Sequence, residues 1–209
     1  MALSRKQKSS SIRDEIAALK RTRILGAAVE LFYANGYENT TLDAVAERLG
    51  VTKPFIYAHF SSKAELLADI SSRAITLSLE AIDSVMPLKL TATEKLRTLS
   101  LRFVSAVLTA QMDLAIFSRE EKNLLKADLD RINDMRRDFD RKLTQLLRDG
   151  VKTGEFKLED PHMAALAIGG MVSWAYVWYR PGGRLPLEAV ADEMSTLLLA
   201  MVGVGNKRV

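Results

Sequence analysis

The side chains best suited to chemistry with another molecule gather between positions 41 and 63. They supply hydroxyls, ammonium groups, an apolar surface, a phenol and an imidazole: Thr41, Thr52, Lys53, Pro54, Phe55, Tyr57, His59 and Lys63. Such a set suits the wall of a DNA groove and its phosphates. Lys53 can reach guanine acceptors or a phosphate, and Phe55 can contact a thymine methyl group. Each residue alone also fits a solvated helical hairpin, but their combination in this order favours DNA.

The remaining side chains are assigned to the DNA backbone. Tyr57 and His59 are expected to contact phosphates, and Thr41 offers a hydroxyl to another one. Lys63 lies in the sequence Ser62-Lys63-Ala64-Glu65, which reads as the capping box of a helix. A helix N-terminus and an ammonium group together attract an anion, so Lys63 is predicted to contact a phosphate.

Two short helices must position these side chains. Thr40 is the expected N-cap of the first, with Asp43 three residues later completing the cap. Its apolar face would consist of Leu42, Val45, Ala46 and Leu49. Gly50 then supplies the turn. Thr52 can cap the second helix, Pro54 is tolerated in its first turn, and Ile56 and Phe60 face inward. This pattern predicts a helix-turn-helix, whose second helix enters the major groove.

Residues 20–67 resemble the N-terminal domain of the TetR family of transcriptional repressors. The resemblance is carried by Ile24-Leu25, Ala27-Ala28, Leu31-Phe32, Gly36-Tyr37, Thr40-Thr41, Ala46, Gly50-Val51, Lys53, Ile56-Tyr57, His59-Phe60, Lys63 and Glu65-Leu66-Leu67. It implies a three-helix DNA-binding domain and, for the whole protein, a homodimer that reads a palindromic operator. The chain departs from the family at Pro54-Phe55, where small residues are more common, and this bears on base preference.

Composition sets the broad class. The chain has 209 residues, a formal net charge of +4 and no cysteine. The absence of cysteine suits a reducing cytoplasm, and the basic N-terminus lacks the apolar segment of a signal peptide. Basic residues gather at the front of the chain: Arg5, Lys6, Lys8, Arg13, Lys20, Arg21 and Arg23. They are interpreted either as a solubilising tail or, ahead of a helix-turn-helix, as an arm that enters the minor groove.

The apolar periodicity along the chain is helical throughout. It predicts an all-α fold of about nine helices, with a DNA-binding domain over 1–67 and a ligand-binding and dimerisation domain over 68–209. The first helix is expected from about Ile12 to Asn35, and a fourth from Lys63 to about Val85. Capping boxes at Thr91–Glu94 and Ser118–Glu121 predict two further helix starts. A long apolar stripe from Leu125 to Leu146 follows, ending at Gly150 to Gly154.

The last two helices are predicted to form the dimer. The segment Met163–Tyr179, in a helix opened by Asp160-Pro161, is almost uncharged but shorter than the roughly twenty residues that span a bilayer. It is therefore expected to be buried on two faces rather than in a membrane. The final helix, from Leu187 to about Gly203, has its own apolar stripe. Two such helices from each of two chains would make a four-helix bundle; the alternative is a purely intramolecular core.

The C-terminal half resembles TetR members that respond to acyl-CoA thioesters. The segments that carry this resemblance are FSREEKNL, GEF before Asp160-Pro161, and GMVSWAYVWYRPGG. It implies an apolar slot for the acyl group and cations for the phosphates. The residues proposed for these roles are Phe103, Arg119, Trp174, Trp178 and Arg180, with Arg184 as a further cation. Alternatively, the tryptophans are core or interface residues and the arginines are solvated.

Other chemistry is not indicated. His162 reads as a helix-start residue, and the aspartates between 128 and 140 alternate with arginines as a salt-bridged surface rather than a metal or acid–base site. No cofactor, metal site or catalytic residue is predicted. The sequence therefore predicts a ligand-responsive, homodimeric transcriptional repressor. The rival hypotheses are an architectural DNA-binding protein without an effector, a regulator of a different hydrophobic molecule, and an enzyme with a borrowed DNA-binding domain.

Overall fold

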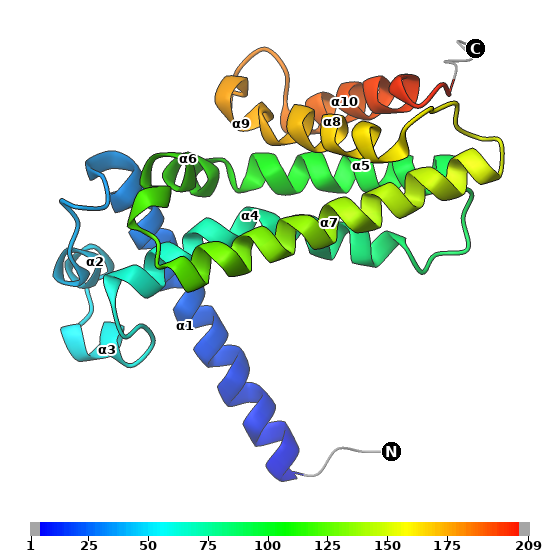
Figure 1. Ribbon diagram of the computed structural model, residues 1–209. Coiled ribbons are helices and arrows are strands. Elements are labelled where there is room, and N and C mark those ends of the chain that lie inside the picture. The colour runs from blue at the N-terminus through cyan, green and yellow to red at the C-terminus, as the bar shows by residue number, and fades with distance from the viewer. Residues whose placement is uncertain (1–4, 205–209) are drawn as a thin grey trace. The chain divides into compact units, whose positions relative to one another are not determined.

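The computed structural model describes the backbone of residues 5–204 and the side chains of residues 13–204. Within that range the fold is all-α, as predicted (Figure 1). The helices are α1 (Arg5–Asn35), α2 (Leu42–Leu49), α3 (Lys53–Tyr57), α4 (Lys63–Val85), α5 (Ala92–Thr109), α6 (Gln111–Glu120), a 3-10 turn η1 (Glu121–Asn123), α7 (Lys126–Lys152), α8 (Pro161–Ser173), α9 (Ala175–Trp178) and α10 (Leu187–Met201).

The chain divides into two compact units. Unit 1 runs to Ser71 and also contains Ile116–Leu125, whereas unit 2 comprises Ser72–Ala115 and the chain from Lys126 onward. The division expected from sequence fell after residue 67 and assigned 116–125 to the second domain. Helices α4 and α6 therefore each have residues in both units.

Unit 1 contains the predicted helix-turn-helix. Ile56 and Phe60 are buried, at 0% and 1% exposed, and they join Ile24 and Phe32 in the core of this unit. Gly50 ends α2 in the left-handed conformation, with φ 65°, as the tight turn requires. Its neighbour Val51 donates its N–H to Ala46 O at 3.0 Å, which closes the turn.

The N-cap of α2 is Thr41, one residue later than predicted. The N–H of Ala44 donates to Thr41 Oγ1 at 3.1 Å. Thr40 is buried instead, and its hydroxyl donates to Gly36 O at 2.9 Å. Asp43 does not complete a capping box but forms an ion pair with Lys53. The prediction failed by one residue because two adjacent threonines are equivalent in sequence, and only the fold decides which one is buried.

Helix α1 begins earlier than predicted. Its backbone is helical from Arg5, whereas the sequence indicated a start near Ile12. It ends at Asn35 as expected, and Gly36 follows with φ 81°. Of the predicted basic arm, residues 1–4 and the side chains of Arg5, Lys6 and Lys8 lie outside the described part of the chain.

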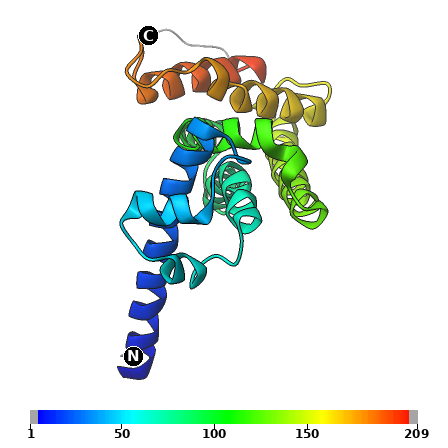
Figure 2. The ribbon, with the colours of Figure 1, turned by 90° about the vertical axis from the view of Figure 1, so that its left-hand side faces the viewer.

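Unit 2 has one apolar core formed mainly by α5, α7, α8 and α10. Helix α10 packs along α5, and α7 packs against α8 and α5; Figure 2 gives a second view of this packing. At its centre, the rings of Phe103 and Phe139 are 4.6 Å apart. Glu155, in the loop before α8, accepts hydrogen bonds from the N–H groups of Ala92 (3.1 Å) and Thr93 (2.8 Å) at the start of α5.

From α4 onward, most predicted helix limits agree with the structure, but two do not. The capping box at Thr91 and Glu94 is present, and α4 runs from Lys63 to Val85 as predicted. The predicted box at Ser118 is wrong, because Ser118 lies inside α6. The helix expected to run to Tyr179 breaks at Trp174, which separates α8 from α9.

In the described residues no single helix is long and apolar enough to cross a membrane. One pair, Ala92–Thr109 with Gln111–Asn123, passes the length and composition test only jointly, and it is bent by 63°.

Candidate nucleic-acid interface and effector residues

Helix α3 presents the side chains predicted to read bases. Thr52 is its N-cap but its hydroxyl makes no capping hydrogen bond, and Pro54 lies in the first turn, as expected. The Lys53 side chain is 63% exposed and pairs with Asp43. That hydrogen bond is the main cause that raises the pKa of Lys53 above its ordinary value, so its ammonium remains charged. The pairing also directs the Lys53 side chain toward α2, which contains Asp43.

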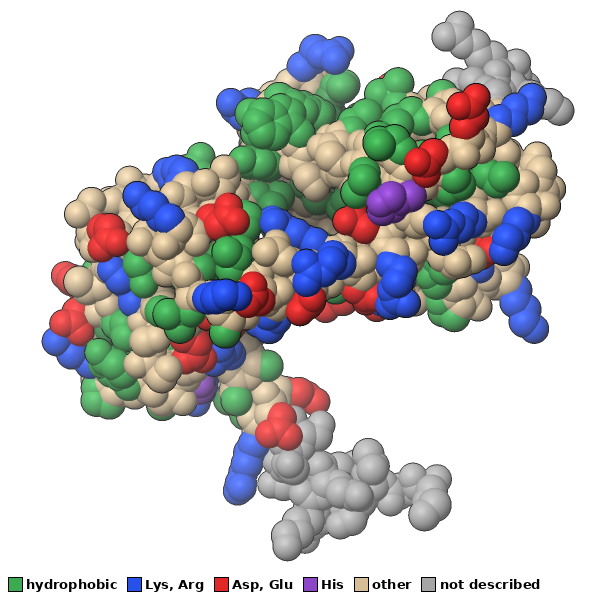
Figure 3. Space-filling model, in the orientation of Figure 1, with side chains coloured by type: hydrophobic (Ala, Val, Ile, Leu, Met, Phe, Trp, Pro, Cys, Tyr) green, Lys and Arg blue, Asp and Glu red, His purple; other side chains and the backbone are tan. Residues whose placement is uncertain are grey.

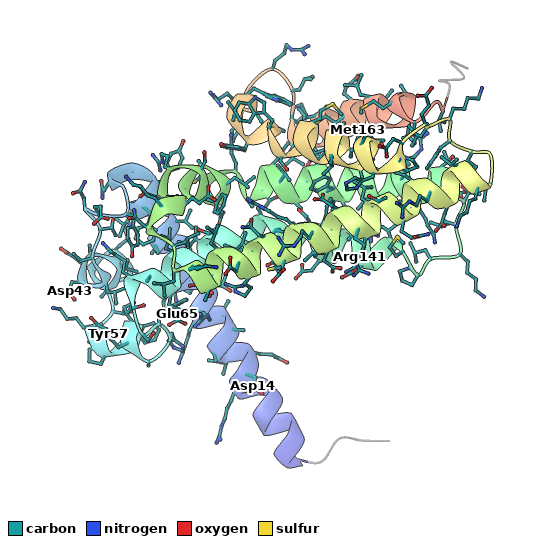
Figure 4. The ribbon with its side chains drawn as sticks, viewed as in Figure 1. Asp14, Asp43, Tyr57, Glu65, Arg141 and Met163 are labelled. Atoms are coloured by element: carbon teal, nitrogen blue, oxygen red, sulfur yellow. The ribbon has the colours of Figure 1, made fainter. Side chains whose placement is uncertain are left out.

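Phe55 is only half-exposed. Its ring lies edge-on to the His59 imidazole, with centroids 5.4 Å apart, and Lys20 Nζ is 5.7 Å from the Phe55 ring. Tyr57 is the most open aromatic group of α3, at 56% exposed; Figure 4 shows Tyr57 and Asp43 at the α2–α3 end of the unit. The structure thus groups Phe55 with His59 and leaves Tyr57 free for a partner.

The Lys63 ammonium has a role that the sequence argument missed. Its Nζ donates to Tyr37 O at 2.9 Å and Glu38 O at 3.3 Å, and it lies 4.2 Å from the centre of the Tyr37 ring. These carbonyls belong to the loop after α1. Lys63 therefore ties the start of α4 to that loop, and a phosphate would have to share its remaining donor capacity.

Arg21 is a central residue of unit 1 that sequence analysis noted only as one of several basic residues. Its guanidinium donates to the carbonyl of His59, to Glu65 (2.8 Å) and to Asp69 (2.6 Å). It also lies 3.8 Å from the centre of the Phe60 ring. Arg21 thus joins α1 to His59 and Phe60, which follow the recognition helix α3, and to the first turns of α4.

The contact with Arg21 lowers the pKa of Glu65. This pKa is held below its ordinary value, first by the hydrogen bond from Arg21 and then by the hydrogen bond from the Ser61 backbone. Glu65 Oε2 accepts the Ser61 N–H at 2.8 Å, while its own N–H donates to Ser62 Oγ at 3.1 Å. The predicted cap at Ser62 is therefore present, with Ser61 in place of Ser62 as the donor to the glutamate.

The segment Ile116–Leu125 contacts the C-terminal end of α1 within unit 1. Arg119 Nη2 donates to Tyr33 O at 3.2 Å, and its guanidinium lies 5.2 Å from the Tyr33 ring. Tyr37 N–H donates to Glu120 Oε1 at 3.3 Å. Arg119, expected from sequence among the effector residues, thus holds a carbonyl of α1.

The other predicted effector residues all belong to unit 2, but only some of them meet. Trp178 and Arg180 line one cavity of about 320 Å³, together with Arg184 and Leu185. Arg180 Nη1 also donates to Val177 O and Tyr179 O, both at 2.9 Å. Phe103 is in the core beside Phe139. Trp174 is 61% exposed and its ring meets Tyr176 edge-on.

The aspartate-rich stretch of α7 is a salt-bridged surface, as predicted. Its pairs are Lys126–Asp130, Arg131–Asp128, Arg137–Asp134, Arg141–Asp138 and Lys142–Asp138, with Lys142 also reaching Asp83. Among the described residues there is no group of three or more His, Asp or Glu side chains arranged to hold a metal ion.

Comparison with known proteins agrees with this geometry. Residues 24–70 match the model of bacterial regulatory proteins of the tetR family, and residues 89–202 match the tetracyclin repressor-like C-terminal domain. The chain belongs to the TetR family. Like the rest of the family, it is a non-enzymatic DNA-binding transcriptional regulator.

Similar proteins include other regulators, one of them in complex with a ligand. The chain is 27% identical over 191 residues to the fatty acid metabolism regulator protein of Bacillus subtilis, covering 90% of this chain and 97% of that protein. The structure of PfmR, a TetR family regulator from Thermus thermophilus, gives a TM-score of 0.77 at 29% identity, covering 89% and 100% of the two chains. AibR in complex with isovaleryl coenzyme A and operator DNA gives a TM-score of 0.71 at 26% identity, covering 86% and 98%.

Proposed function

We propose that this TetR-type regulator is a homodimeric repressor that a coenzyme A thioester releases from a palindromic operator. The observation that carries the DNA-binding part is the exposure of Lys53 and Tyr57 on a recognition helix that Arg21 ties to α1 and α4. A helix held in this way is already ordered before it enters the major groove. Lys53 and Phe55 are assigned to bases, and Thr41, Tyr57 and His59 to phosphates.

Exposed apolar side chains on α8 and α10 support the dimer. Met163 is 61% exposed, Leu166 42%, Leu197 55% and Met201 42%. Opposite faces of the same helices contribute to the core, for example Ile168 and Leu198. A second copy of this chain would bury the exposed face, and paired recognition helices would match half-sites about 34 Å apart or a multiple of that spacing.

The dimer has a direct test. Leu197→Asp should yield monomers in analytical ultracentrifugation and reduce operator binding. The matched change Leu90→Asp, at a 41% exposed leucine in the loop before α5, should leave the dimer intact. A Leu197→Asp protein that remains dimeric would contradict this interface.

The proposed effector rests on similarity and on one cavity. The AibR structure contains isovaleryl coenzyme A, and a similar Bacillus protein regulates fatty acid metabolism. In this chain Trp178 offers an apolar wall, and Arg180 and Arg184 offer cations within the same cavity. This pairing of apolar surface and positive charge is what an acylated nucleotide requires.

The proposed mechanism is a shift between two states of the dimer. Helices α4 and α6 each have residues in both units, so a rearrangement that an effector causes in unit 2 can reach unit 1 through them. Through Arg119 and Glu120, the end of α6 also contacts the last turn of α1 and the residue after Gly36. The effector releases DNA only to the extent that it binds the two states with different affinity.

Two experiments test the function. Selection from a random DNA library should give a palindromic consensus, and Lys53→Ala should lose preference among sequences while retaining affinity for bulk DNA. A panel of coenzyme A thioesters should then be titrated against the selected operator complex. Failure of every thioester to release DNA would exclude the proposed effector class but not the repressor.

One observation favours a second effector class. A groove of about 500 Å³ between α4 and α5 is lined by four apolar residues, Leu77, Ala81, Leu101 and Ala106, and by four polar ones that include Glu80 and Arg102. Such a groove suits a hydrophobic molecule that also carries a polar group. Mass spectrometry of small molecules that co-purify with the protein would distinguish this class from a thioester.

A further inference from the structure

A second cavity in unit 2 lies between α7 and α8 and is strongly cationic. Its volume is about 260 Å³, and its lining consists of Arg137, Asp140, Arg141, Thr144, Arg148 and His162. We infer that this cavity binds a phosphate or diphosphate group. The group belongs either to the proposed coenzyme A ester or to a free phosphorylated small molecule. The first source rests on the proposed function, and the second does not.

The charge of the lining matches that ligand. Three arginines and one carboxylate, with a neutral histidine, give the lining a formal charge of +2. A phosphate monoester carries about −1.5 to −2 near pH 7. Arg137 and Arg141 are separated by about one helical turn, so both guanidinium groups lie on one face of α7. Figure 3 shows a row of Lys and Arg side chains along α7, and Figure 4 shows Arg141 on that helix.

The ion pairs of these arginines leave donors available. Arg137 and Arg141 each contact a neighbouring aspartate through Nη2, on a surface where their side chains are 69% and 77% exposed. Exposed pairs of this kind are weak and exchange easily. A guanidinium has five N–H donors, so the groups can keep the aspartate and still bind an anion.

Two further polar groups, the buried Thr144 and the exposed His162, complete the lining of the cavity. Thr144 is 3% exposed, and its hydroxyl lies 3.4 Å from His162 Nδ1. Both can donate to a phosphate oxygen. Asp140 is half-buried, and burial is the main cause that raises its pKa above the ordinary value, with His162 and Arg136 opposing. A carboxyl group that protonates more readily repels an anion less.

The size of the cavity limits what enters it. Pockets that enclose a drug-sized ligand are commonly about 300–1,000 Å³. A cavity of about 260 Å³ therefore takes a phosphate-bearing end rather than a whole acylated nucleotide.

The test is calorimetric titration of the full-length protein with two probes: pyrophosphate and coenzyme A. Arg148→Ala and Arg141→Ala should each weaken pyrophosphate binding about tenfold, as expected for one lost charged hydrogen bond. The control is Arg97→Ala, which removes an exposed arginine of α5 outside this lining and should change affinity less than twofold. Both target side chains lie at the surface, so thermal unfolding should be unchanged.

The outcomes separate the two sources and the two proposals. Pyrophosphate binding that depends on Arg148 supports the site. If coenzyme A binds more tightly than pyrophosphate and its binding depends on Arg148, the phosphate group in the site belongs to the nucleotide. If coenzyme A binds no more tightly than pyrophosphate, the phosphate group belongs to a free phosphorylated molecule. If the site binds but no thioester releases DNA, the proposed effector fails and the site stands. If pyrophosphate does not bind, or binds equally to all variants, the inference is overturned even where thioesters release DNA.

Discussion

Replacement of Arg21 by alanine tests whether a contact outside α3 determines how tightly α3 binds DNA. The change removes the hydrogen bond to the His59 carbonyl, the pairs with Glu65 and Asp69, and the contact with the Phe60 ring. Because this side chain joins α1 to the residues that follow α3 and to the first turns of α4, its loss should loosen α3 and the start of α4 together.

The expected magnitude follows from exposure. The Arg21 side chain is 35% exposed and its carboxylate partners are 34% and 31% exposed. Each partly exposed pair therefore contributes about 0.2–1 kcal/mol, the charged hydrogen bond to a carbonyl about 1.5–3 kcal/mol, and the ring contact about 0.5–1 kcal/mol. These contacts share one side chain and do not add. We expect a loss of about 2–3 kcal/mol in unfolding free energy.

Urea unfolding, hydrogen exchange and operator binding make up the assay. Arg21→Ala should speed exchange of the Ser61 amide, which donates to Glu65, and should weaken operator binding roughly three- to tenfold because fewer molecules hold the competent conformation. The control Arg48→Ala removes a pair with Glu30 in which both side chains are more than half-exposed, at 59% and 54%, and should cost less than about 0.5 kcal/mol.

Two results would refute the reasoning. If Arg21→Ala costs no more stability than Arg48→Ala, the contacts of Arg21 do not hold the unit together. If stability falls while operator affinity and Ser61 exchange stay unchanged, Arg21 stabilises the fold without positioning α3. Arg21→Lys should restore only part of the effect, because an ammonium lacks the planar fork.

Three further predictions follow from single contacts. Lys63→Ala should lower the unfolding free energy, measured in urea, by about 1–2 kcal/mol, because the Lys63 ammonium donates to two carbonyls. If Lys63 also contacts a phosphate, the same change should flatten the salt dependence of DNA binding by about one unit. An unchanged salt dependence would mean that Lys63 has a structural role alone. Glu155 has its pKa lowered to about 2, first by the backbone hydrogen bond from the start of α5, so its contribution is present above the unfolded value of 4.5 and is lost as pH falls toward 2. Glu155→Gln should therefore cost about 1–2 kcal/mol at pH 7 and little at pH 2, as thermal unfolding across that range would show, and a loss independent of pH would contradict the assignment. Gly150→Ala should cost more than about 2 kcal/mol, because an added Cβ would lie 2.1 Å from the Phe156 ring. By contrast, Gly26→Ala, where nothing lies within 4 Å, should stabilise helix α1 by about 0.5–1 kcal/mol, and calorimetric unfolding of both glycine variants would measure the two changes.

Local signals determined much of the DNA-binding unit. The turn at Gly50, the inward Ile56 and Phe60 and the start of α4 at Lys63 were all predicted, because each depends on residues within a few positions of one another. Where two neighbours had equal local merit, the prediction was wrong by one residue: Thr40 and Thr41 both suit an N-cap, and only the burial of Thr40 decided between them.

Helix ends without a strong local signal were harder to predict. Ser118–Glu121 has the pattern of a capping box, yet it lies at the end of α6, where Arg119 and Glu120 bind α1 and its following loop. The helix break at Trp174 has neither proline nor glycine at the break itself, so local rules did not indicate it.

The sequence by itself determined the all-α class, the helix-turn-helix and its exposed side chains, because periodicity, caps and turn residues are local properties. The tertiary structure alone decided which charged groups of different helices meet. Arg21 with His59, Glu65 and Asp69, Lys63 with the loop after α1, and His162 of α8 with the arginines of α7 all depend on the packing of helices. A charged side chain on a helix surface has the same local preferences whether water or a distant residue faces it. Its partner therefore becomes known only when the helices are placed.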